Sequence, residues 1–411
     1  MESSVEIIPK PPQLSAELFL IPLPAEKYLV YAPLRRAAFL ANASLVNVLA
    51  DLKQATADLP LDPDLLALLR ELKIVDGEPE RVPVTNFQGQ PRPTQLTLFM
   101  TTACNLRCTY CYAAAGDTPL KSMKLETACR GIDLVAANAA QTEQRTFKIV
   151  YHGGGEPTVN WSVLTESYEY ALAKAEELDL RFTASAGTNG VLRDEQIDWI
   201  IDHLSGGVSL SFDGLPEAND RHRLTVSGQG SSERVLHTMT RFDEAGYPYG
   251  IRLTVTHDTV AQLPAAMEFL CARFHPVRMQ VEPAYQLGRW DGAPSAETQE
   301  FIDAFRAARS AAEQYGQRLT YSAARLDVLT NHFCGVTQDI FALSPDGNVS
   351  GCYEVFSEDN RFADLFFYGK SEPATGKFLF NLPVLDALRE QTVENREFCQ
   401  GCFARWHCAG D

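Results

Sequence analysis

Apolar residues recur along this chain with a spacing that changes from one region to the next. From Leu96 to about Tyr285, short apolar runs alternate with longer segments whose apolar residues have helical spacing. This alternation predicts parallel strands that are joined by helices through right-handed crossovers. The predicted strands are Leu96–Met100, Phe147–Tyr151, Leu180–Ala184, Val208–Phe212, Gly250–Val255 and Val277–Val281.

Six strand–helix units are too few to close an eight-stranded barrel. We therefore expect an α/β fold whose centre, over about residues 94–310, is a partial (β/α)6 barrel. In sheets of this kind the reactive groups lie on the loops that follow the C-terminal ends of the strands. The motifs described below fall on such loops.

Residues 1–80 follow another pattern and are expected to form a small separate domain. Short strands are predicted at Leu18–Leu23, Tyr28–Tyr31 and Ala37–Leu40, and helices at Ser44–Lys53 and Pro63–Leu72. Asp62-Pro63 is typical of a helix start, because the aspartate caps the helix and proline fits its first turn. A linker rich in proline and glycine follows at about Asp76–Pro93.

Residues 311–411 are predicted to form a third domain that is rich in loops, with turn signals such as Pro345-Asp346-Gly347. Five of the ten cysteines of the chain lie here, between Cys334 and Cys408. We expect this region to depend on bound metal for its stability.

The net charge of −17 argues against nucleic acid as a partner, because binding to phosphates requires a basic surface. No segment has the roughly 20 consecutive apolar residues that span a bilayer. The start of the chain lacks the features of a signal peptide. We therefore expect a cytoplasmic protein without a membrane partner. Because disulfides are rare in that compartment, clustered cysteines indicate metal binding.

The first cysteine cluster comes directly after the first barrel strand. Cys104, Cys108 and Cys111 have the spacing C-x3-C-x2-C. Thiolates bind iron–sulfur clusters, and a four-iron cluster has four iron corners. Three cysteines hold three irons and leave the fourth open to a ligand with an amine and a carboxylate. A zinc site is the alternative, although structural zinc takes a fourth protein ligand.

This spacing, with Tyr110 just before the last cysteine, resembles the radical S-adenosylmethionine (SAM) superfamily, and the resemblance extends over about residues 94 to 411. It implies that a [4Fe–4S] cluster on Cys104, Cys108 and Cys111 binds SAM and passes an electron to it. Cleavage of SAM would give a 5′-deoxyadenosyl radical that abstracts a hydrogen atom from the substrate. The resemblance also implies an electron donor such as flavodoxin or ferredoxin.

Further loops resemble the SAM-binding segments of this family. The segment Gly153-Gly154-Gly155-Glu156-Pro157 looks like the family's GGEP motif, which holds the amine of the methionine part. Consecutive glycines allow a ligand to approach the backbone closely. Ordinary turns at strand ends and a surface ion pair are the alternative interpretation of the later loops. The resemblance implies SAM-side roles for Tyr110, Gly154, Gly155, Glu156, Pro157, Ser185, Asn189, Ser211, Asp213 and Arg223.

The C-terminal cysteines resemble those of the SPASM domain, which carries auxiliary iron–sulfur clusters in part of this family. Cys334, Gly347 and Cys352 have the spacing C-x12-G-x4-C, and a block C-x2-C-x5-C follows. A zinc knuckle is the alternative. The resemblance implies one or two auxiliary clusters on Cys334, Cys352, Cys399, Cys402 and Cys408.

The same family pattern would place another cysteine directly after Asp411 and one more beyond it. We therefore expect that the chain is shortened at its C-terminus, or that a disordered tail carries the remaining cysteines. Each auxiliary cluster would lack one family ligand in this form.

The N-terminal domain indicates the class of substrate. SPASM enzymes mostly modify peptides or proteins, and the order of three strands and two helices resembles the winged-helix recognition domain of ribosomal-peptide maturases. Such a domain would bind a leader peptide as an added strand at its sheet edge; an inert cap on the barrel is the alternative. The resulting hypothesis is a maturase that abstracts hydrogen from a ribosomally made precursor peptide and installs a crosslink, thioether or epimer.

Two other functions remain open. A sulfatase-maturing enzyme would oxidise a Cys or Ser to formylglycine, but that group has an aspartate just after the second SPASM cysteine, where this chain has Tyr353-Glu354 after Cys352. A non-catalytic iron–sulfur or zinc scaffold would explain the cysteines but not the glycine–glutamate loop. Glu354 and Glu282 are the candidates for a catalytic base, and Glu282 has a structural role as its alternative.

Overall fold

The computed structural model describes residues 12–54, 62–84, 87–117, 119–290 and 295–410. The chain divides into two compact units. The first, here called the terminal unit, consists of Met1–Thr85, Arg325–Phe333 and Thr392–Asp411. The second, here called the barrel unit, consists of Asn86–Ala324 and Cys334–Gln391.

The barrel unit is built on one sheet with the strand order β10-β9-β8-β7-β6-β5-β4-β11-β12-β13-β14. Neighbouring strands from β10 to β11 run parallel, so the predicted partial barrel of an α/β fold is confirmed. The six predicted strands are present as β4 (Gln95–Thr101), β5 (Thr146–Gly154), β6 (Arg181–Thr188), β7 (Val208–Ser211), β8 (Tyr249–Val255) and β9 (Arg278–Pro283), and β10 (Leu319–Thr320) adds an edge.

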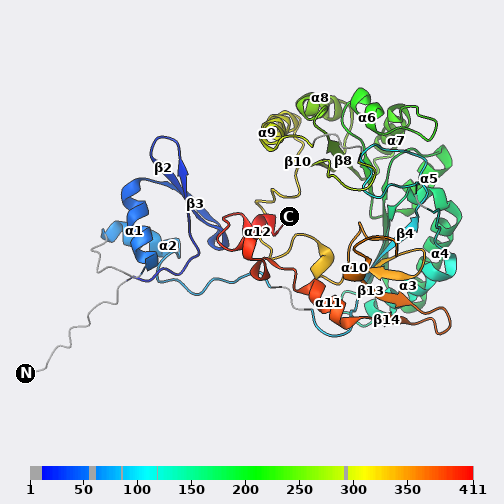
Figure 1. Ribbon diagram of the computed structural model, residues 1–411, viewed down its shortest axis with the longest axis horizontal. Coiled ribbons are helices and arrows are strands. Elements are labelled where there is room, and N and C mark those ends of the chain that lie inside the picture. Colours follow the sequence, from blue (N-terminus) through cyan, green and yellow to red (C-terminus); the bar gives the residue numbers. More distant parts are fainter. Residues whose placement is uncertain (1–11, 55–61, 85–86, 118, 291–294, 411) are drawn as a thin grey trace, which may run out of the picture. The chain divides into compact units, whose positions relative to one another are not determined.

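Helices follow the parallel strands and cover the outer face of the sheet (Figure 1). Side chains on that face are apolar: Ile251 and Leu253 of β8 are 2% and 0% exposed. The alternate residues face inward and are polar and more accessible, as at Ser209 of β7 and Arg252 of β8. The helices are α3 (Leu125–Ala139), α4 (Trp161–Leu178), α5 (Asp194–His203), α6 (Pro216–His222), α7 (Ser232–Glu244), α8 (Leu263–Arg273) and α9 (Thr298–Gln314).

Part of the region that was predicted to be loop-rich extends this sheet. β11 (Ala342–Leu343) pairs in parallel with β4, and β12 (Asn348–Ser350), β13 (Phe367–Ser371) and β14 (Phe378–Phe380) follow in antiparallel order. Strands of two to five residues are too short to show a clear alternation in sequence, which is why the pattern did not predict them. Two short helices, α10 (Ala363–Phe366) and α11 (Leu382–Arg389), accompany them.

The terminal unit contains the predicted strands and helices of the N-terminal region. β1 (Phe19–Leu23), β2 (Lys27–Ala32) and β3 (Ala37–Ala41) form an antiparallel sheet, and α1 (Ala43–Gln54) and α2 (Pro63–Glu71) follow. Asp62 caps α2 as predicted, since its carboxylate accepts the backbone N–H groups of Asp64 and Leu65 at 2.9 and 3.1 Å.

The last residues of the chain also belong to the terminal unit. α12 (Arg405–Cys408) is fixed there by Glu17, whose carboxylate accepts Trp406 Nε1 at 2.6 Å and lies 2.8 Å from the Arg405 guanidinium. The imidazole of His407 contacts the hydroxyl of Tyr31 on β2. The C-terminal cysteine block is therefore packed on the N-terminal strands.

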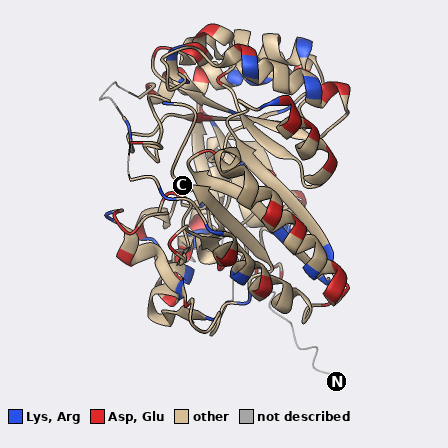
Figure 2. Cartoon of the chain, turned by 90° about the vertical axis from the view of Figure 1, so that its right-hand side faces the viewer, with Lys and Arg blue, Asp and Glu red and all other residues tan. Residues whose placement is uncertain are grey.

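Acidic residues are spread over the helices, with basic residues among them (Figure 2). This distribution agrees with the acidic composition and shows no basic face in this view. Among the described residues, no helix combines the length and the apolar character that a membrane span requires.

Candidate functional site

The three cysteines of the first motif lie on the loop that follows β4. Its two ends are joined, because Gly116 N donates to Thr102 O at 2.9 Å, and Cys111 N donates to Cys108 O at 3.3 Å. The thiols are close enough for the charges of Cys108 and Cys111 to act on Cys104. All three side chains are half-buried and are not joined in disulfides.

The chemistry of these donors fits an iron–sulfur cluster. Burial, and then the charge of Glu156, raises the pKa of Cys104 to about 12, and burial raises the pKa of Cys108 to about 11. A thiolate is thus costly here without a metal to replace its proton. Within the described residues no three His, Cys, Asp or Glu side chains are gathered closely enough to hold a single ion.

The glycine-rich loop after β5 is bonded directly to the stem of the cysteine loop. Gly155 N donates to Thr101 O at 2.7 Å and Glu156 N donates to Ala103 O at 2.9 Å. A Cβ atom at residue 155 would lie 1.9 Å from Ala103 O, so only glycine allows this approach. The two sequence motifs therefore form one connected structure at the C-terminal ends of β4 and β5.

Glu156 joins this loop to the end of β6. Its side chain is only 2% exposed, and burial raises its pKa. Oε1 accepts Thr158 Oγ1 at 2.8 Å and Thr188 Oγ1 at 2.9 Å, and Oε2 accepts the backbone N–H of Asn189 at 2.8 Å. Among the described residues Oε2 has this one donor, so one of its lone pairs remains for a further donor. Pro157 begins the 3₁₀ turn η2 (Pro157–Asn160) that follows.

Asn189 in turn reaches the cysteine loop. Its Nδ2 donates to Asn105 Oδ1 at 2.7 Å and lies 3.6 Å from the sulfur of Cys104. Leu106 N lies 3.4 Å from the same sulfur. Donors aimed at a cysteine sulfur stabilise its thiolate, which is the form that binds iron.

Tyr110, Asp213 and Arg223 form a buried group beside the cysteine loop. The Tyr110 hydroxyl donates to Asp213, and Arg223 Nε lies 3.1 Å from Asp213 Oδ1. Burial lowers the pKa of Arg223, but the charges of Asp213, Tyr110 and Cys108 outweigh it and leave the pKa above its ordinary value. The group is therefore an ion pair that fixes Tyr110. Asp220, three residues before Arg223, accepts the backbone N–H groups of Ser231 and Ser232 at the start of α7.

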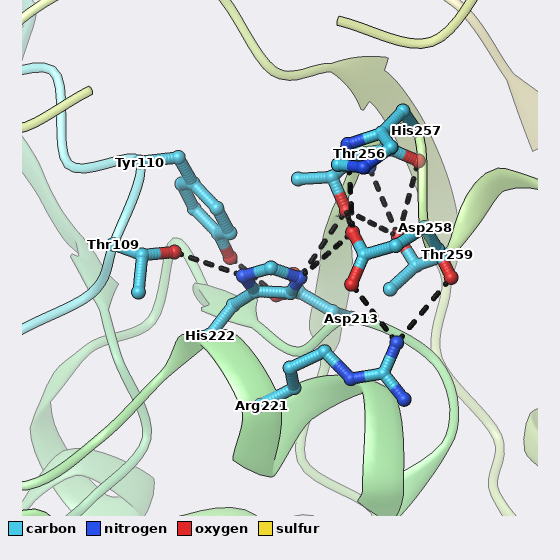
Figure 3. Close-up of polar contacts among 9 residues, drawn as sticks. All are labelled: Thr109, Tyr110, Asp213, Arg221, His222, Thr256, His257, Asp258 and Thr259. Atoms are coloured by element: carbon cyan, nitrogen blue, oxygen red, sulfur yellow. Dashed lines mark hydrogen bonds and ion pairs between the residues drawn. The ribbon is translucent and has the colours of Figure 1, made fainter. Parts of the chain in front are cut away.

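A second polar group holds the loop through Thr109 (Figure 3). Thr109 Oγ1 lies 2.8 Å from His222 Nδ1, and Thr109 N donates to His222 O at 3.0 Å. His222 Nε2 lies 3.2 Å from Asp258 Oδ1, and Arg221 donates to Asp258 Oδ2 at 2.9 Å. The sequence pattern does not predict this group, because His222 and Asp258 match no motif and meet only when α6 folds against the end of β8.

The segment after β9 holds the loop from another direction. Arg289 donates to Cys108 O at 2.9 Å and to Ala115 O at 2.6 Å, and its Nε lies 2.5 Å from Asp117 Oδ2. Its backbone N donates to Cys111 O at 2.9 Å. The guanidinium of Arg289 is thus engaged in fixing the cysteine loop.

Two of the C-terminal cysteines lie in the barrel unit next to this site. Cys334 is exposed and Cys352 half-buried, and burial, opposed in part by a backbone hydrogen bond, raises the pKa of Cys352 to about 11. The charge of Cys352 acts on Tyr112, the residue after Cys111. Gly347, the glycine of the SPASM-like spacing, has φ +81° in the turn between β11 and β12, where its N donates to Ser344 O at 2.9 Å.

The remaining three cysteines lie close together in the terminal unit. Cys402 N donates to Cys399 O at 3.2 Å, and Cys408 ends α12. Burial raises the pKa of Cys399, and the charges of Cys402 and Cys408 act in the same direction. The two blocks of the SPASM-like pattern thus belong to different compact units.

The other predicted residues are distributed over the inner face and its rim. Ser185 on β6 and Ser211 on β7 are half-buried at positions that alternate with buried apolar residues. Glu282 is buried on β9 and accepts Ser322 Oγ at 2.8 Å and Gln280 Nε2 at 2.6 Å, so its carboxylate is already bonded within the fold. Glu354 is exposed, and its charge acts on Tyr112.

Residues 98–270 match the model of the radical SAM superfamily. The chain contains a radical SAM domain. That assignment agrees with the presence of the cysteine loop and the glycine–glutamate loop, and the radical SAM family implies a [4Fe–4S] cluster and SAM.

Three relatives of the radical SAM domain are peptide-maturation or cofactor-synthesis proteins. The Fe-coproporphyrin III synthase of Methanosarcina barkeri is 29% identical over 173 residues, which are 42% of this chain and 39% of that protein. The sporulation killing factor maturation protein SkfB of Bacillus subtilis is 25% identical over 179 residues, 43% and 39% of the two chains. The mycofactocin maturase MftC of Mycolicibacterium smegmatis is 27% identical over 280 residues, 64% and 65% of the two chains. The matches thus span less than two thirds of each relative.

Two solved structures share the fold. Native anSMEcpe with bound AdoMet and the Cp18Cys peptide is 16% identical, with a TM-score of 0.56 over 76% of this chain and 88% of that one. Streptococcus suis SuiB with bound S-adenosylmethionine is 13% identical, with a TM-score of 0.52 over 97% and 95% of the two chains. These likenesses concern the fold.

Proposed function

We propose that this chain is a radical SAM maturase that modifies a ribosomally made precursor peptide. The bonding of the glycine–glutamate loop to the stem of the cysteine loop supports this most directly, because it gathers the two halves of a SAM site at one end of the sheet. Relatives that are named maturases support the choice of a peptide substrate.

In this proposal Cys104, Cys108 and Cys111 hold three irons of a [4Fe–4S] cluster and leave the fourth for SAM. When bound, the cluster and SAM supply a 5′-deoxyadenosyl radical that removes a hydrogen atom from the peptide. Glu156 keeps the glycine loop and Asn189 in place for the methionine part of SAM. The buried Asp213–Arg223 pair fixes Tyr110 beside the last cysteine.

The domain assignment is part of the proposal. Residues 94–310 would form the barrel that carries out the chemistry, and residues 311–411 would hold one or two auxiliary clusters. The cysteines for these clusters would be Cys334, Cys352, Cys399, Cys402 and Cys408. An electron donor such as flavodoxin or ferredoxin would reduce the protein in the cytoplasm, where thiols stay reduced.

Residues 1–80 would bind the leader of the precursor. β3 is at the edge of its sheet, and beside it lies a pocket of about 860 Å³ that is lined by Phe39, Leu45, Leu65 and other residues. An extended peptide could pair with the free edge of β3 and place apolar side chains in this pocket. Arg35, Arg36 and Lys73 also line it together with one acidic residue, Glu71, so the excess of positive charge favours an acidic leader segment.

A sulfatase-maturing enzyme is the second candidate, because a 24% identical relative from Clostridium novyi is a cysteine-type anaerobic sulfatase-maturating enzyme. We rank this candidate below the peptide maturase. Sulfatase-maturing enzymes have an aspartate just after the second SPASM cysteine, whereas this chain has Tyr353 and the exposed Glu354 after Cys352. A scaffold without catalytic activity is the third candidate. A scaffold does not explain why the glycine loop is hydrogen-bonded to the stem of the cysteine loop.

The deciding experiment is anaerobic reconstitution with iron and sulfide, followed by dithionite and SAM. Formation of 5′-deoxyadenosine by the parent but not by Cys104→Ala is expected. If the protein retains zinc, forms no cluster and does not cleave SAM, the enzyme hypothesis is wrong and the scaffold hypothesis remains. A sulfatase peptide with a cysteine at the target position, assayed for formylglycine, separates the two enzyme candidates.

A further inference from the structure

Arg252 occupies an unusual place in the middle of β8. Its backbone neighbours are Ser211 on β7 and Gln280 on β9, so it lies in the interior of the sheet and not at an edge. Ile251 and Leu253 on either side of it are buried under the helices, whereas Arg252 is exposed. Because successive side chains point to opposite faces of a strand, its guanidinium lies on the inner face of the barrel.

This guanidinium has no protein partner in the part of the chain that the structure describes. No carboxylate lies within 4 Å of it and none of its N–H groups makes a hydrogen bond there. The nearest acidic side chain on the neighbouring strand is Glu282, whose oxygens are bonded to Gln280 and Ser322. A guanidinium offers five N–H donors in a fixed fork that matches a carboxylate. Those donors remain available on the inner face.

The charge of Arg252 is felt by two side chains around the same space. Burial, followed by the charge of Arg252, lowers the pKa of His152 on β5 to about 4. The charge of Arg252 also acts on Tyr112. His152 Nδ1 is buried and has no hydrogen-bond partner among the described residues. His152 is therefore neutral near pH 7, and Arg252 is the group there that carries the positive charge.

The two side chains that feel the charge of Arg252 adjoin the predicted SAM-binding loops. Tyr112 directly follows Cys111, and His152 directly precedes the glycine loop that approaches the cysteine stem. Ser211, the backbone neighbour of Arg252, adds a hydroxyl on the same face. A cation, a hydroxyl and a neutral imidazole thus surround the region where SAM and substrate would meet.

We propose that Arg252 is the anchor of a carboxylate-binding site on the inner face of the barrel. The inference rests on the proposed function, and the carboxylate comes either from the methionine part of SAM or from the peptide that enters the barrel. Both sources share the chemistry of a paired guanidinium and carboxylate. In either case Arg252 determines how a ligand is oriented toward the cluster.

The first test measures ligand affinity, without turnover. SAM binding to the reconstituted, unreduced protein is compared in the parent, Arg252→Gln and Arg252→Lys by equilibrium dialysis. Loss of a charge-assisted bidentate contact is expected to weaken binding about 10- to 100-fold in Arg252→Gln, with partial recovery in Arg252→Lys. Arg278→Gln is the matched control. Arg278 is an exposed arginine at the start of β9, and its side chain lies on the same face of the sheet as that of Gln280.

The second test identifies the source of the carboxylate. Phenylglyoxal labels exposed arginines, and mass spectrometry reports the labelling of Arg252. Protection by SAM but not by decarboxylated SAM assigns the site to SAM. Protection by the peptide N-acetyl-Gly-Glu-Gly-amide, and not by its Gln counterpart, with unchanged SAM affinity in Arg252→Gln, assigns it to the peptide.

Failure of this inference differs from failure of the proposed function. If the parent forms 5′-deoxyadenosine, yet SAM and the acidic peptide leave Arg252 labelling unchanged and Arg252→Gln binds SAM normally, the carboxylate site is wrong and the radical SAM activity stands. If no cluster forms, the proposed function fails, and labelling of the cluster-free protein with the acidic peptide still tests Arg252.

Discussion

The imidazole of His222 lies between Thr109 and Asp258, with its Nε2 3.2 Å from the Asp258 carboxylate (Figure 3). Thr109 stands between the cysteines Cys108 and Cys111, and Asp258 follows β8. The pair therefore connects the loop that would hold the cluster to a strand about 150 residues later. A carboxylate fixes both the tautomer and the orientation of a histidine in such an arrangement.

Replacing Asp258 by asparagine should make the free energy of unfolding depend less on pH in the acidic range. Burial raises the pKa of Asp258, but hydrogen bonds from Thr256 and Arg221 and the charge of His222 hold it well below its ordinary value. Its contribution to stability is therefore complete above about pH 4 and is lost as the pH falls further. We expect Asp258→Asn to lower the free energy of unfolding by about 1–3 kcal/mol at pH 7, with a smaller difference at pH 3.

Urea denaturation of the cofactor-free protein between pH 3 and pH 7 measures this difference. Asp202→Asn serves as the control, since Asp202 is exposed on α5. Parallel profiles for the parent and Asp258→Asn would show that the carboxylate does not act through its charge.

Glu156→Gln should weaken SAM binding and leave the cluster in place. Three donors converge on Oε1 and one on Oε2, so an amide NH2 at either position would face a donor. Because a lost hydrogen bond to a buried charge costs about 1.5–3 kcal/mol, SAM affinity should fall about 10- to 100-fold. Iron content and SAM binding of the reconstituted variant are measured beside those of Glu166→Gln, an exposed residue of α4. Loss of iron together with SAM binding would mean that Glu156 supports the whole site.

Arg289→Lys should accelerate the loss of iron from the reconstituted protein. Lysine keeps the charge but cannot contact Cys108 O, Ala115 O and Asp117 together, as the guanidinium does. We expect iron release to a chelator to be at least about tenfold faster, given about 1.5–3 kcal/mol for each hydrogen bond to a charged group. Arg278→Lys is the matched substitution away from the loop. If the parent and Arg289→Lys release iron at equal rates, Arg289 does not stabilise the cysteine loop.

Glu17→Ala should loosen the last helix of the chain. Trp406 and Arg405 of α12 both bond to the Glu17 carboxylate, and Cys408 ends that helix. Hydrogen exchange at the backbone amides of α12 should become faster by about 10-fold or more, as expected for one lost hydrogen bond to a charge. Glu26→Ala, at an exposed turn between β1 and β2, should leave exchange in α12 unchanged. Faster exchange in both variants would indicate a general effect on the terminal unit.

The sequence alone determined the features that depend on neighbours along the chain. Alternating apolar segments predicted β4 to β9 to within a few residues, because burial under helices requires apolar side chains wherever a strand passes beneath them. The spacing of Cys104, Cys108 and Cys111 identified the cysteine loop, since one short loop supplies all three thiols. Glycines beside Glu156 marked the second loop for the same reason.

Tertiary structure decided everything that joins distant segments. Arg289, His222 and Asp258 meet the cysteine loop only after five or six strands have been laid side by side, and none of them belongs to a recognisable motif. Glu282 was a candidate base in the sequence, but the fold bonds its carboxylate to Ser322. The exposed face of Arg252 depends on which side of the finished sheet the helices cover. A hydrogen bond or an ion pair requires proximity in space, and the sequence pattern records only proximity along the chain.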